Sequence, residues 1–315
     1  MNENAPFNLF EKGSLGTCWY GKYHYMEPWA GCGHDCAYCY ARHRSAVTGR
    51  LAEAGNPFER PLLLFDMDEL LKKIREGVAA NGVKILKLCR YTDFFTPAFA
   101  RDGTAAAVLE TLCATDVERI IITTKGAPGD DIIDIMARRR EKISYNAAVK
   151  PAGGYRLESG APETAARLEA AEKISRLGIK TTIHMDPLIP AADRLENMPD
   201  FLSDLKRRGL SRLMFSFLLL NDPIISSIRK VLPEPAMAAL LDDFNLDASR
   251  KFLPKQDETV LYSLRDDLRK RYSEKLGGML AEKGFDFVIC SLKSNRGEAE
   301  TRPSNCPACD GTFYA

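Results

Sequence analysis

The sequence lacks the features of a membrane or secreted protein. No run of apolar residues approaches the roughly 18 that a membrane-spanning helix needs. Residues 1–13 contain no basic stretch followed by an apolar one, so we expect no secretory signal. These absences predict a cytoplasmic protein without membrane contact, in a compartment where thiols stay reduced.

An excess of charge of one sign is also absent. The 44 Lys and Arg residues balance 43 Asp and Glu residues, for a formal net charge of +1. Proteins that grip nucleic acid through its phosphates usually carry a surplus of basic side chains. The bulk charge therefore gives no support to a nucleic-acid partner. Internal repeats and low-complexity segments are absent too, which excludes a solenoid.

The chain does contain short apolar runs that alternate with amphipathic segments. We expect a first strand around residues 26–31 and further strands at 83–89, 119–125, 142–149, 180–189 and 212–220. We expect helices at 67–79, 103–114, 130–140, 163–177 and 197–208. Such alternation predicts an α/β fold with parallel strands. About six βα units fit, so we expect a partial (β/α)6 TIM-type barrel, open on one side.

Three parts are expected along the chain. They are an N-terminal extension (1–25), the barrel (26–220) and a C-terminal extension (221–315) that closes one side of it. The last part contains a Pro-punctuated helical region at 223–242, a charged helix near 257–283 and a short strand at 285–290. Ligands of parallel sheets bind at the carboxyl ends of the strands, so we expect the site in the loops that follow them.

Three of the nine cysteines are concentrated in one loop. Cys32, Cys36 and Cys39 fall within eight residues. Three thiolates at this spacing suit three corners of an iron–sulfur cube, and the absence of a fourth leaves one iron open to a ligand. A structural zinc site is the alternative. Zinc usually takes two separated ligand pairs, and His34, which could supply a fourth ligand, lies inside the loop, where its reach is poor.

The residues around these cysteines resemble a known family. The C-x3-C-x2-C spacing is similar to the signature of the radical S-adenosylmethionine (SAM) superfamily. The fuller segment GCGHDCAYCYAR (31–42) resembles its spore photoproduct lyase-like branch. Further motifs similar to that branch follow in order, namely Thr92-Asp93 with Pro97, Thr124-Lys125, Glu158-Ser159-Gly160-Ala161-Pro162 and Pro187-Leu188-Ile189-Pro190. The chain departs from the branch at Ser159, where proline is usual, and at Ala191, where glycine is usual.

This resemblance implies an enzyme with a [4Fe–4S] cluster that binds SAM at its open iron. An electron from an external reductant, of the flavodoxin or ferredoxin type, breaks the sulfonium bond of SAM and yields a radical that takes hydrogen from substrate. By position, Lys125 and Ser144 correspond to contacts of the SAM carboxylate, and Asp93 to a residue that orients SAM or substrate. Tyr38, Leu188 and Ile189 would contact the adenine. The alternatives are a solvated loop lysine for Lys125, a loop cap for Asp93 and ordinary core packing for Leu188 and Ile189.

Cys89 is the most informative of the isolated cysteines. It ends an expected strand, so it should point toward the site or lie beside it. Spore photoproduct lyases place a hydrogen-donating cysteine near this motif, one residue closer to the aspartate than here. The resemblance thus predicts a catalytic role for Cys89, as the donor that returns a hydrogen atom to a product radical. A buried small side chain is the alternative interpretation.

A second set of cysteines lies near the C-terminus. Cys306 and Cys309 form a CxxC, and Cys290 ends a short expected strand. These three could ligate a second iron–sulfur cluster, with Cys18 as a fourth ligand. A redox pair, a zinc clip and free thiols remain open alternatives.

Three functions compete at this stage. The first is radical modification of a peptide or small molecule, which a second cluster would favour. The second is lyase-type repair of UV-linked pyrimidine dimers in DNA, which rests on similarity to the branch. The third is a non-catalytic iron–sulfur protein, against which the three-cysteine loop argues.

Overall fold

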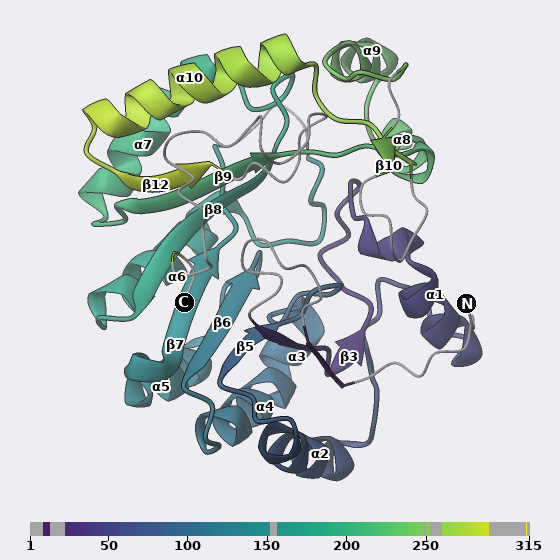
Figure 1. Ribbon diagram of the computed structural model, residues 1–315, viewed down its shortest axis with the longest axis vertical. Helices are drawn as coiled ribbons and strands as arrows, with labels where there is room; N and C mark the ends of the chain where they lie inside the picture. The colour runs from purple at the N-terminus through teal and green to yellow at the C-terminus, as the bar shows by residue number, and fades with distance from the viewer. Residues whose placement is uncertain are drawn as a thin grey trace.

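A computed structural model shows an open, mostly parallel sheet wrapped by helices (Figure 1). The structure describes residues 9–12, 23–151, 156–247, 250–251, 260–289 and 313. In spatial order the strands of the main sheet are β1 (Phe10–Lys12), β2 (His24–Met26), β5 (Ile85–Leu88), β6 (Arg119–Thr124), β7 (Ile143–Ala147), β8 (Lys180–Leu188), β9 (Arg212–Phe217) and β12 (Asp286–Ile289). All neighbours from β2 to β12 pair in parallel, and β1 runs antiparallel to β2.

The expected partial barrel is confirmed, with two differences. The strands expected between residues 83 and 220 all form, and β1 and β12 end an open strand order. The first strand, however, is β2 rather than 26–31, since Trp29–Ala30 forms β3 and pairs with β4 (Leu62–Leu63) in a separate sheet. The strand expected at 285–290 is β12, which pairs with β9 and so extends the main sheet.

Helices follow the strands and cover the outer face of the sheet (Figure 1). They are α1 (Ser45–Glu53), α2 (Met67–Ala80), α3 (Pro97–Arg101), α4 (Thr104–Cys113), α5 (Asp130–Arg138), α6 (Thr164–Arg176), α7 (Met198–Arg207), α8 (Asp222–Arg229), α9 (Glu234–Asp242) and α10 (Asp266–Glu282). The first residue of α2 is fixed by Asp66, whose carboxylate accepts the Glu69 N–H at 2.9 Å. A search of the described helices finds none long and apolar enough to cross a membrane.

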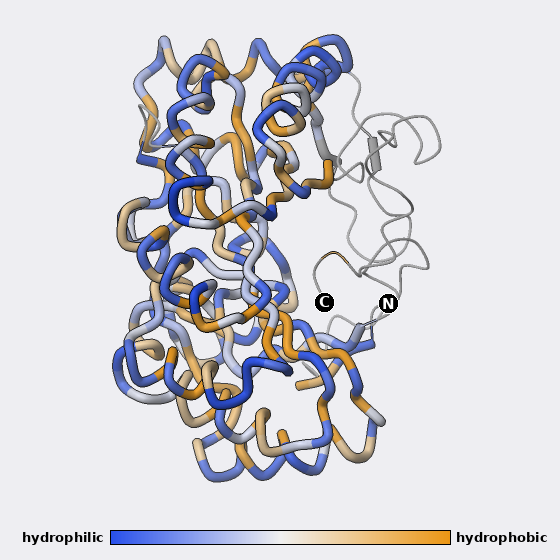
Figure 2. The backbone as a smooth tube through the Cα atoms, turned by 90° about the vertical axis from the view of Figure 1, so that its left-hand side faces the viewer, coloured by the Kyte–Doolittle hydropathy of each residue, from blue (hydrophilic) through white to orange (hydrophobic). Residues whose placement is uncertain are grey.

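The two faces of the sheet differ in polarity because side chains alternate along a strand. On β6, Ile120 and Ile122 join the large apolar core under the helices, whereas Ile121 faces the opposite side. That inner face carries several buried polar residues, which are Lys87, Ser144, Asn146, Thr182, His184 and Ser216. Apolar segments run through the body of the tube in Figure 2 and hydrophilic ones dominate its outer turns. The inner face is therefore suited to a polar ligand.

Candidate active site

The cysteine loop (residues 31–40) follows β3 and turns sharply at Gly31. This glycine has φ +86°, and an added Cβ would lie 2.6 Å from the carbonyl oxygen of Phe58. The next residue, Cys32, donates its N–H to the same oxygen at 2.8 Å. Only glycine combines this dihedral angle with so close an approach, so the backbone here sets where the first thiol lies.

A second segment, the strap (residues 157–160), lies along the cysteine loop. The Ala37 N–H donates to the Leu157 carbonyl at 2.8 Å, and the Gly160 N–H donates to the His34 carbonyl at 2.9 Å. A Cβ on Gly160 would lie 2.1 Å from the Gly33 oxygen, so a side chain has no room there. The strap therefore holds the cysteine loop through backbone contacts that need a glycine.

Ser159, which stands where the motif usually has proline, makes a hydrogen bond to the cysteine loop. Its hydroxyl donates to the Asp35 carboxylate at 2.7 Å and lies 3.2 Å from the Asp35 carbonyl. The same carboxylate accepts from Arg42 at 2.7 Å. Serine in place of proline thus adds a hydrogen bond between the strap and the cysteine loop.

The three thiols of the loop are free and lie within electrostatic reach of one another. Burial raises the pKa of Cys32 to about 12 and that of Cys36 well above its ordinary value. The charge on Cys39 raises both pKa values further. The Cys32 and Cys36 thiols are therefore protonated in the cluster-free protein, and binding of a metal cluster has to release those protons.

The His34 side chain contacts Asp93. Its Nε2 lies 3.3 Å from Oδ2 of Asp93, and its side chain is 1% exposed. Within the described part of the chain, no three His, Cys, Asp or Glu side chains lie together as they would around one metal ion, and this includes the three loop cysteines. A zinc site in this loop would need His34 as its fourth ligand. The His34 imidazole instead contacts the carboxylate of Asp93.

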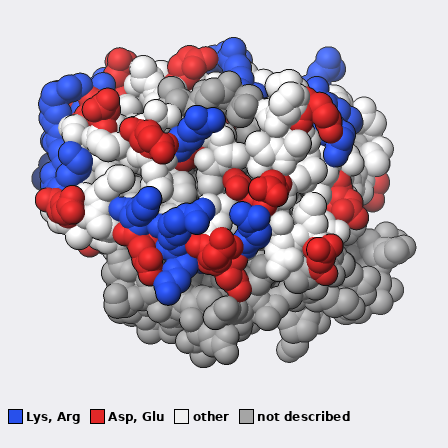
Figure 3. Space-filling model, turned by 90° about the horizontal axis from the view of Figure 1, so that it is seen from above, with Lys and Arg blue, Asp and Glu red and all other residues white. Residues whose placement is uncertain are grey.

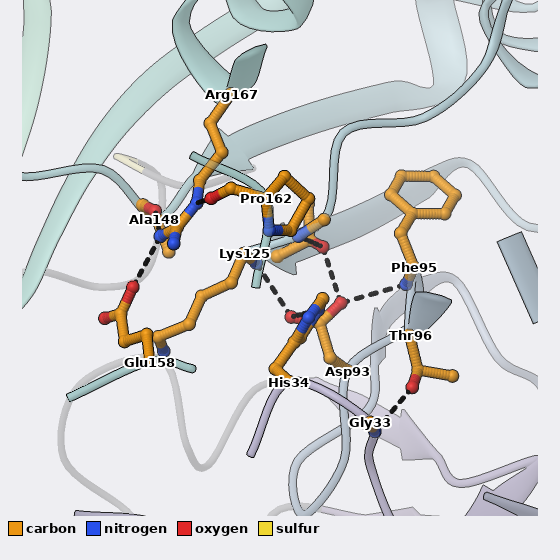
Figure 4. A network of polar contacts seen from close by, with 12 residues as sticks. Gly33, His34, Asp93, Phe95, Thr96, Lys125, Ala148, Glu158, Pro162 and Arg167 are labelled. Atoms are coloured by element: carbon orange, nitrogen blue, oxygen red, sulfur yellow. Dashed lines mark hydrogen bonds and ion pairs between the residues drawn. The ribbon is translucent and has the colours of Figure 1, made fainter. Parts of the chain in front are cut away.

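Asp93 joins the loops after β5 and β6 to the cysteine loop (Figure 4). Its Oδ1 accepts the Phe95 N–H at 2.9 Å and the Thr124 hydroxyl, and its Oδ2 accepts the Lys125 N–H at 2.7 Å. Burial alone would raise the pKa of this carboxyl, but His34 and these hydrogen bonds lower it to about 2. Asp93 is therefore ionised, and both of its oxygens are already engaged by protein groups.

Tyr38 is buried, with two lysines close to its ring. The Nζ atoms of Lys125 and Lys150 lie 5.6 Å and 5.7 Å from the centre of its ring. The phenol hydroxyl donates to Glu158 of the strap. Burial and the nearby Glu158 charge raise the pKa of Tyr38 well above its ordinary value, so the phenol stays neutral.

One of the three cations around Tyr38 makes no direct ion pair in the described part of the protein. Arg167 pairs with Glu158 at 2.6 Å (Figure 4), and Lys150 pairs with Asp193 at 3.0 Å. The ammonium group of Lys125 has no hydrogen-bond or ion-pair partner among the described residues. Burial would lower the pKa of Lys125, but the neighbouring anionic groups raise it, so the group stays charged.

Lys150 is a site residue that sequence reasoning missed. It follows β7 as Lys125 follows β6, and a lysine at the end of an apolar strand run was the signal available for both. Its Nζ also donates to the Pro187 carbonyl at 3.3 Å. Lys150 thus links the end of β7 to the segment after β8.

Leu188 and Ile189 lie at the end of β8 and are fully buried in the apolar core. The Ile189 N–H donates to Asp193 at 2.8 Å, the same carboxylate that pairs with Lys150. The pair is therefore held near the ring of Tyr38 through Lys150. Contact with adenine remains a prediction for both residues.

The structure separates Ser144 from Lys125. Ser144 pairs with Ile121 across β7 and β6, four positions before Lys125. At about 3.3 Å per residue, their backbones are about 13 Å apart along the strand direction. The Ser144 hydroxyl is buried and, in the described part of the protein, has no hydrogen-bond partner. The register therefore does not bring together the two residues expected to share the SAM carboxylate.

Cys89 directly follows β5 and is buried, with an unusual φ of +59°. Burial raises the pKa of its thiol well above the ordinary value, and the charges of Glu27, Asp93 and Cys32 add to this. The thiol is thus within electrostatic reach of the cysteine loop, as the expected position beside the site requires. Its role as a hydrogen donor remains a prediction.

The C-terminal cysteines lie outside the described residues. This applies to Cys290, Cys306 and Cys309 and also to Cys18. A second iron–sulfur cluster therefore remains a prediction from the sequence.

Comparisons with known structures show the same architecture. A cysteine-to-alanine mutant of spore photoproduct lyase with a dinucleoside spore photoproduct superposes with a TM-score of 0.60 at 16% identity, covering 83% of this chain and 74% of that one. A double mutant of that lyase with bound AdoMet gives 0.59 at 16% identity, covering 84% and 75%. Streptococcus suis SuiB bound to S-adenosylmethionine gives 0.50 at 11% identity, covering 84% and 49%. No curated protein matches the sequence.

Family membership follows from the sequence match. The model of the Radical SAM superfamily matches residues 26–193, which is more than half of the chain and includes the cysteine loop, Asp93, Lys125 and the strap. That family implies a [4Fe–4S] cluster and SAM. The three free thiols in one loop, with no fourth cysteine beside them in sequence, fit such a cluster. The chain therefore belongs to the radical SAM superfamily and is a radical SAM enzyme.

Proposed function

We propose that this enzyme cleaves SAM at a cluster held by Cys32, Cys36 and Cys39 and acts on a peptide or small molecule. The observation that carries the proposal is the unpaired ammonium group of Lys125 beside the cysteine loop. When bound there, the cluster and SAM supply an electron and a carbon radical that removes hydrogen from the substrate.

The charge balance supports a carboxylate partner for Lys125. The neighbouring cations Lys150 and Arg167 are already neutralised by Asp193 and Glu158. An ammonium group that makes no direct ion pair gains from a ligand that brings a carboxylate, through a charge-assisted hydrogen bond. The carboxylate of SAM is such a ligand.

Other residues are proposed as contacts for the rest of SAM. Tyr38, Leu188 and Ile189, which are buried near Lys150, are the side chains proposed to contact the adenine ring. Ser144 offers a buried hydroxyl on the inner face of the sheet for a polar group of the cofactor. Asp93 acts through Lys125 and His34, because both of its oxygens are already bonded to protein groups.

We also propose that an external one-electron reductant, of the flavodoxin or ferredoxin type, serves this site. Tyr40, which directly follows Cys39, is 44% exposed. This side of the cysteine loop therefore reaches the surface, where a protein donor has access to it.

Repair of pyrimidine dimers in DNA is the second candidate function. The fold similarity to spore photoproduct lyase and the thiol of Cys89 near the cysteine loop favour it. On the face seen in Figure 3, however, Lys and Arg residues are interspersed with Asp and Glu residues. Such a surface gives less electrostatic attraction to phosphates than a basic one does.

The test is release of 5′-deoxyadenosine by anaerobic, reconstituted and dithionite-reduced enzyme. We expect release that depends on SAM and is lost in Lys125→Met, but is kept in Lys84→Met, which alters a surface lysine paired with Glu118. No release by wild-type enzyme that contains its cluster would contradict the proposal. Strong stimulation by UV-irradiated DNA would select the second candidate, and indifference to it would favour a peptide or metabolite.

A further inference from the structure

Glu27 is a buried carboxyl group with no place in the proposed function. It directly follows β2 and is 5% exposed. Its Oε1 accepts the backbone N–H groups of Arg90 and Tyr91, the latter at 3.0 Å, and its Oε2 lies 3.4 Å from the Thr92 hydroxyl. One carboxyl group therefore holds three consecutive residues of the turn after β5.

Cys89 stands immediately before this turn. Its φ of +59° lies in the left-handed region, which residues other than glycine seldom adopt. Its own N–H donates to the carbonyl of Met26, the residue before Glu27, at 3.0 Å. A sparsely populated conformation of this kind persists only where its surroundings hold it, and here the end of β2 does so.

The electrostatic environment of Glu27 and Cys89 keeps the Cys89 thiol in its S–H form. Burial raises the pKa of Glu27 to about 8 and the pKa of Cys89 well above its ordinary value. Any negative charge on Glu27 raises the pKa of the thiol further. A hydrogen-atom donor has to carry its proton, so this environment suits the role expected of Cys89.

We propose that Glu27 is a positioning residue, which fixes the thiol of Cys89 by gripping the turn at residues 90–92. The inference rests on the proposed function for its catalytic meaning, since only an active radical enzyme has use for a placed thiol. The contacts themselves are independent of any reaction, and they can be tested without a substrate.

The experiment measures how fast iodoacetamide alkylates Cys89 in the anaerobic reconstituted enzyme, read by mass spectrometry of the peptide. Glu27→Met and Glu27→Gln form a matched pair of similar volume, and only Gln keeps an acceptor oxygen. We expect Glu27→Met to speed alkylation about 10-fold or more, because the turn opens, and Glu27→Gln to stay within about 2-fold of wild type. Thr92→Val, which removes a contact of the same carboxyl group and a hydrogen bond of the Cys89 thiol itself, should also speed alkylation.

Two controls separate local from general loosening. Cys113, a buried thiol at the end of α4, should keep its alkylation rate in every variant. Glu11→Ala removes an exposed carboxylate that meets the Arg90 side chain at 3.6 Å but not the turn backbone, so it should leave Cys89 unchanged. An unchanged Cys89 rate in both Glu27→Met and Thr92→Val would overturn the proposal, and so would equal acceleration of Cys89 and Cys113.

The same preparations are assayed for 5′-deoxyadenosine release. Release should persist in Glu27→Met, since no hydrogen bond of the Glu27 side chain in the described structure is to the cysteine loop or to Lys125, although the turn that it holds meets the loop where Tyr40 donates to the Arg90 carbonyl. Absence of release from the wild-type enzyme would count against the proposed function alone, because the alkylation result does not depend on it. Selective acceleration at Cys89 would still establish the positioning contact.

Discussion

The carboxylate of Asp93 accepts the backbone N–H of Lys125 at 2.7 Å, which fixes the point from which the lysine side chain leaves β6. The other oxygen of Asp93 binds Phe95 and Thr124. The unpaired cation of the site is therefore anchored by a buried anion that lies under its main chain. Binding of a carboxylate by Lys125 should depend on both residues.

A double-mutant cycle on these two residues tests the dependence. Lys125→Met should weaken SAM binding to the reconstituted enzyme about 10- to 100-fold, the value of a charge-assisted hydrogen bond. Asp93→Ala should weaken SAM binding less than Lys125→Met does. In the double variant it should cause little further weakening, because Asp93 acts through Lys125. Equilibrium dialysis with labelled SAM gives the four dissociation constants. Fully additive effects would mean that Asp93 contributes by another route.

Gly160→Ala should lower the amount of iron–sulfur cluster that the enzyme binds. The new Cβ would lie 2.1 Å from the Gly33 oxygen, so the strap has to move away from the cysteine loop. We expect iron per reconstituted chain to fall to less than about half of the wild-type value, with the circular dichroism of the fold retained. Gly278→Ala is the matched control, since a Cβ there meets nothing within 4 Å. Normal iron content in Gly160→Ala would show that the strap does not support the loop.

Much of this architecture was accessible from sequence because its signals are local. The strand–helix alternation gave the partial barrel, and the spacing of Cys32, Cys36 and Cys39 gave the loop. The motif order also gave Asp93 and Lys125 at the edge where the structure places them. Apolar periodicity and residue spacing report on nearest neighbours along the chain, whereas Asp93 and Lys125 were expected from the resemblance to a known family.

The remaining features depend on pairing between distant segments. The sequence predicts one strand around residues 26–31, yet a change of partner splits this segment between two sheets. The depth of Ser144 relative to Lys125 follows from strand register, which a motif does not encode. The contacts that define the roles of Glu27 and Lys150 are with residues more than 40 positions away in the sequence, so local patterns do not reveal them.

The raised pKa of Glu27 predicts an unusual dependence of stability on pH. The carboxyl binds its proton more tightly in the folded state (pKa about 8) than in the unfolded state (4.5), so its contribution is complete below pH 4.5 and is lost as pH rises through 8. At about 1.4 kcal/mol per pKa unit, the loss is at most about 5 kcal/mol. Glu27→Gln lacks this titration.

Urea unfolding of cluster-free protein at several pH values measures the effect. The unfolding free energy of wild type minus that of Glu27→Gln should fall between about pH 5 and pH 8, because all other titrating groups cancel in the difference. Glu11→Gln, which alters an exposed carboxylate, should show no such trend against wild type. A difference that rises with pH would mean that the hydrogen bonds from the turn outweigh burial and keep Glu27 ionised.

Cys89→Ala separates radical formation from hydrogen return. Release of 5′-deoxyadenosine should continue, since Cys89 is not among the three loop cysteines. Under the second candidate function, the Cys89 S–H bond breaks as a C–H bond forms on the product radical. The thiyl radical left on Cys89 is then restored by one electron and one proton, the electron coming from the external reductant. With UV-irradiated DNA, repaired pyrimidine per 5′-deoxyadenosine should fall at least about 5-fold in Cys89→Ala and not in Cys113→Ala. An unchanged ratio would mean that Cys89 is a buried structural thiol. In that case the product radical obtains its hydrogen atom equally well without Cys89, so Cys89 is not the donor.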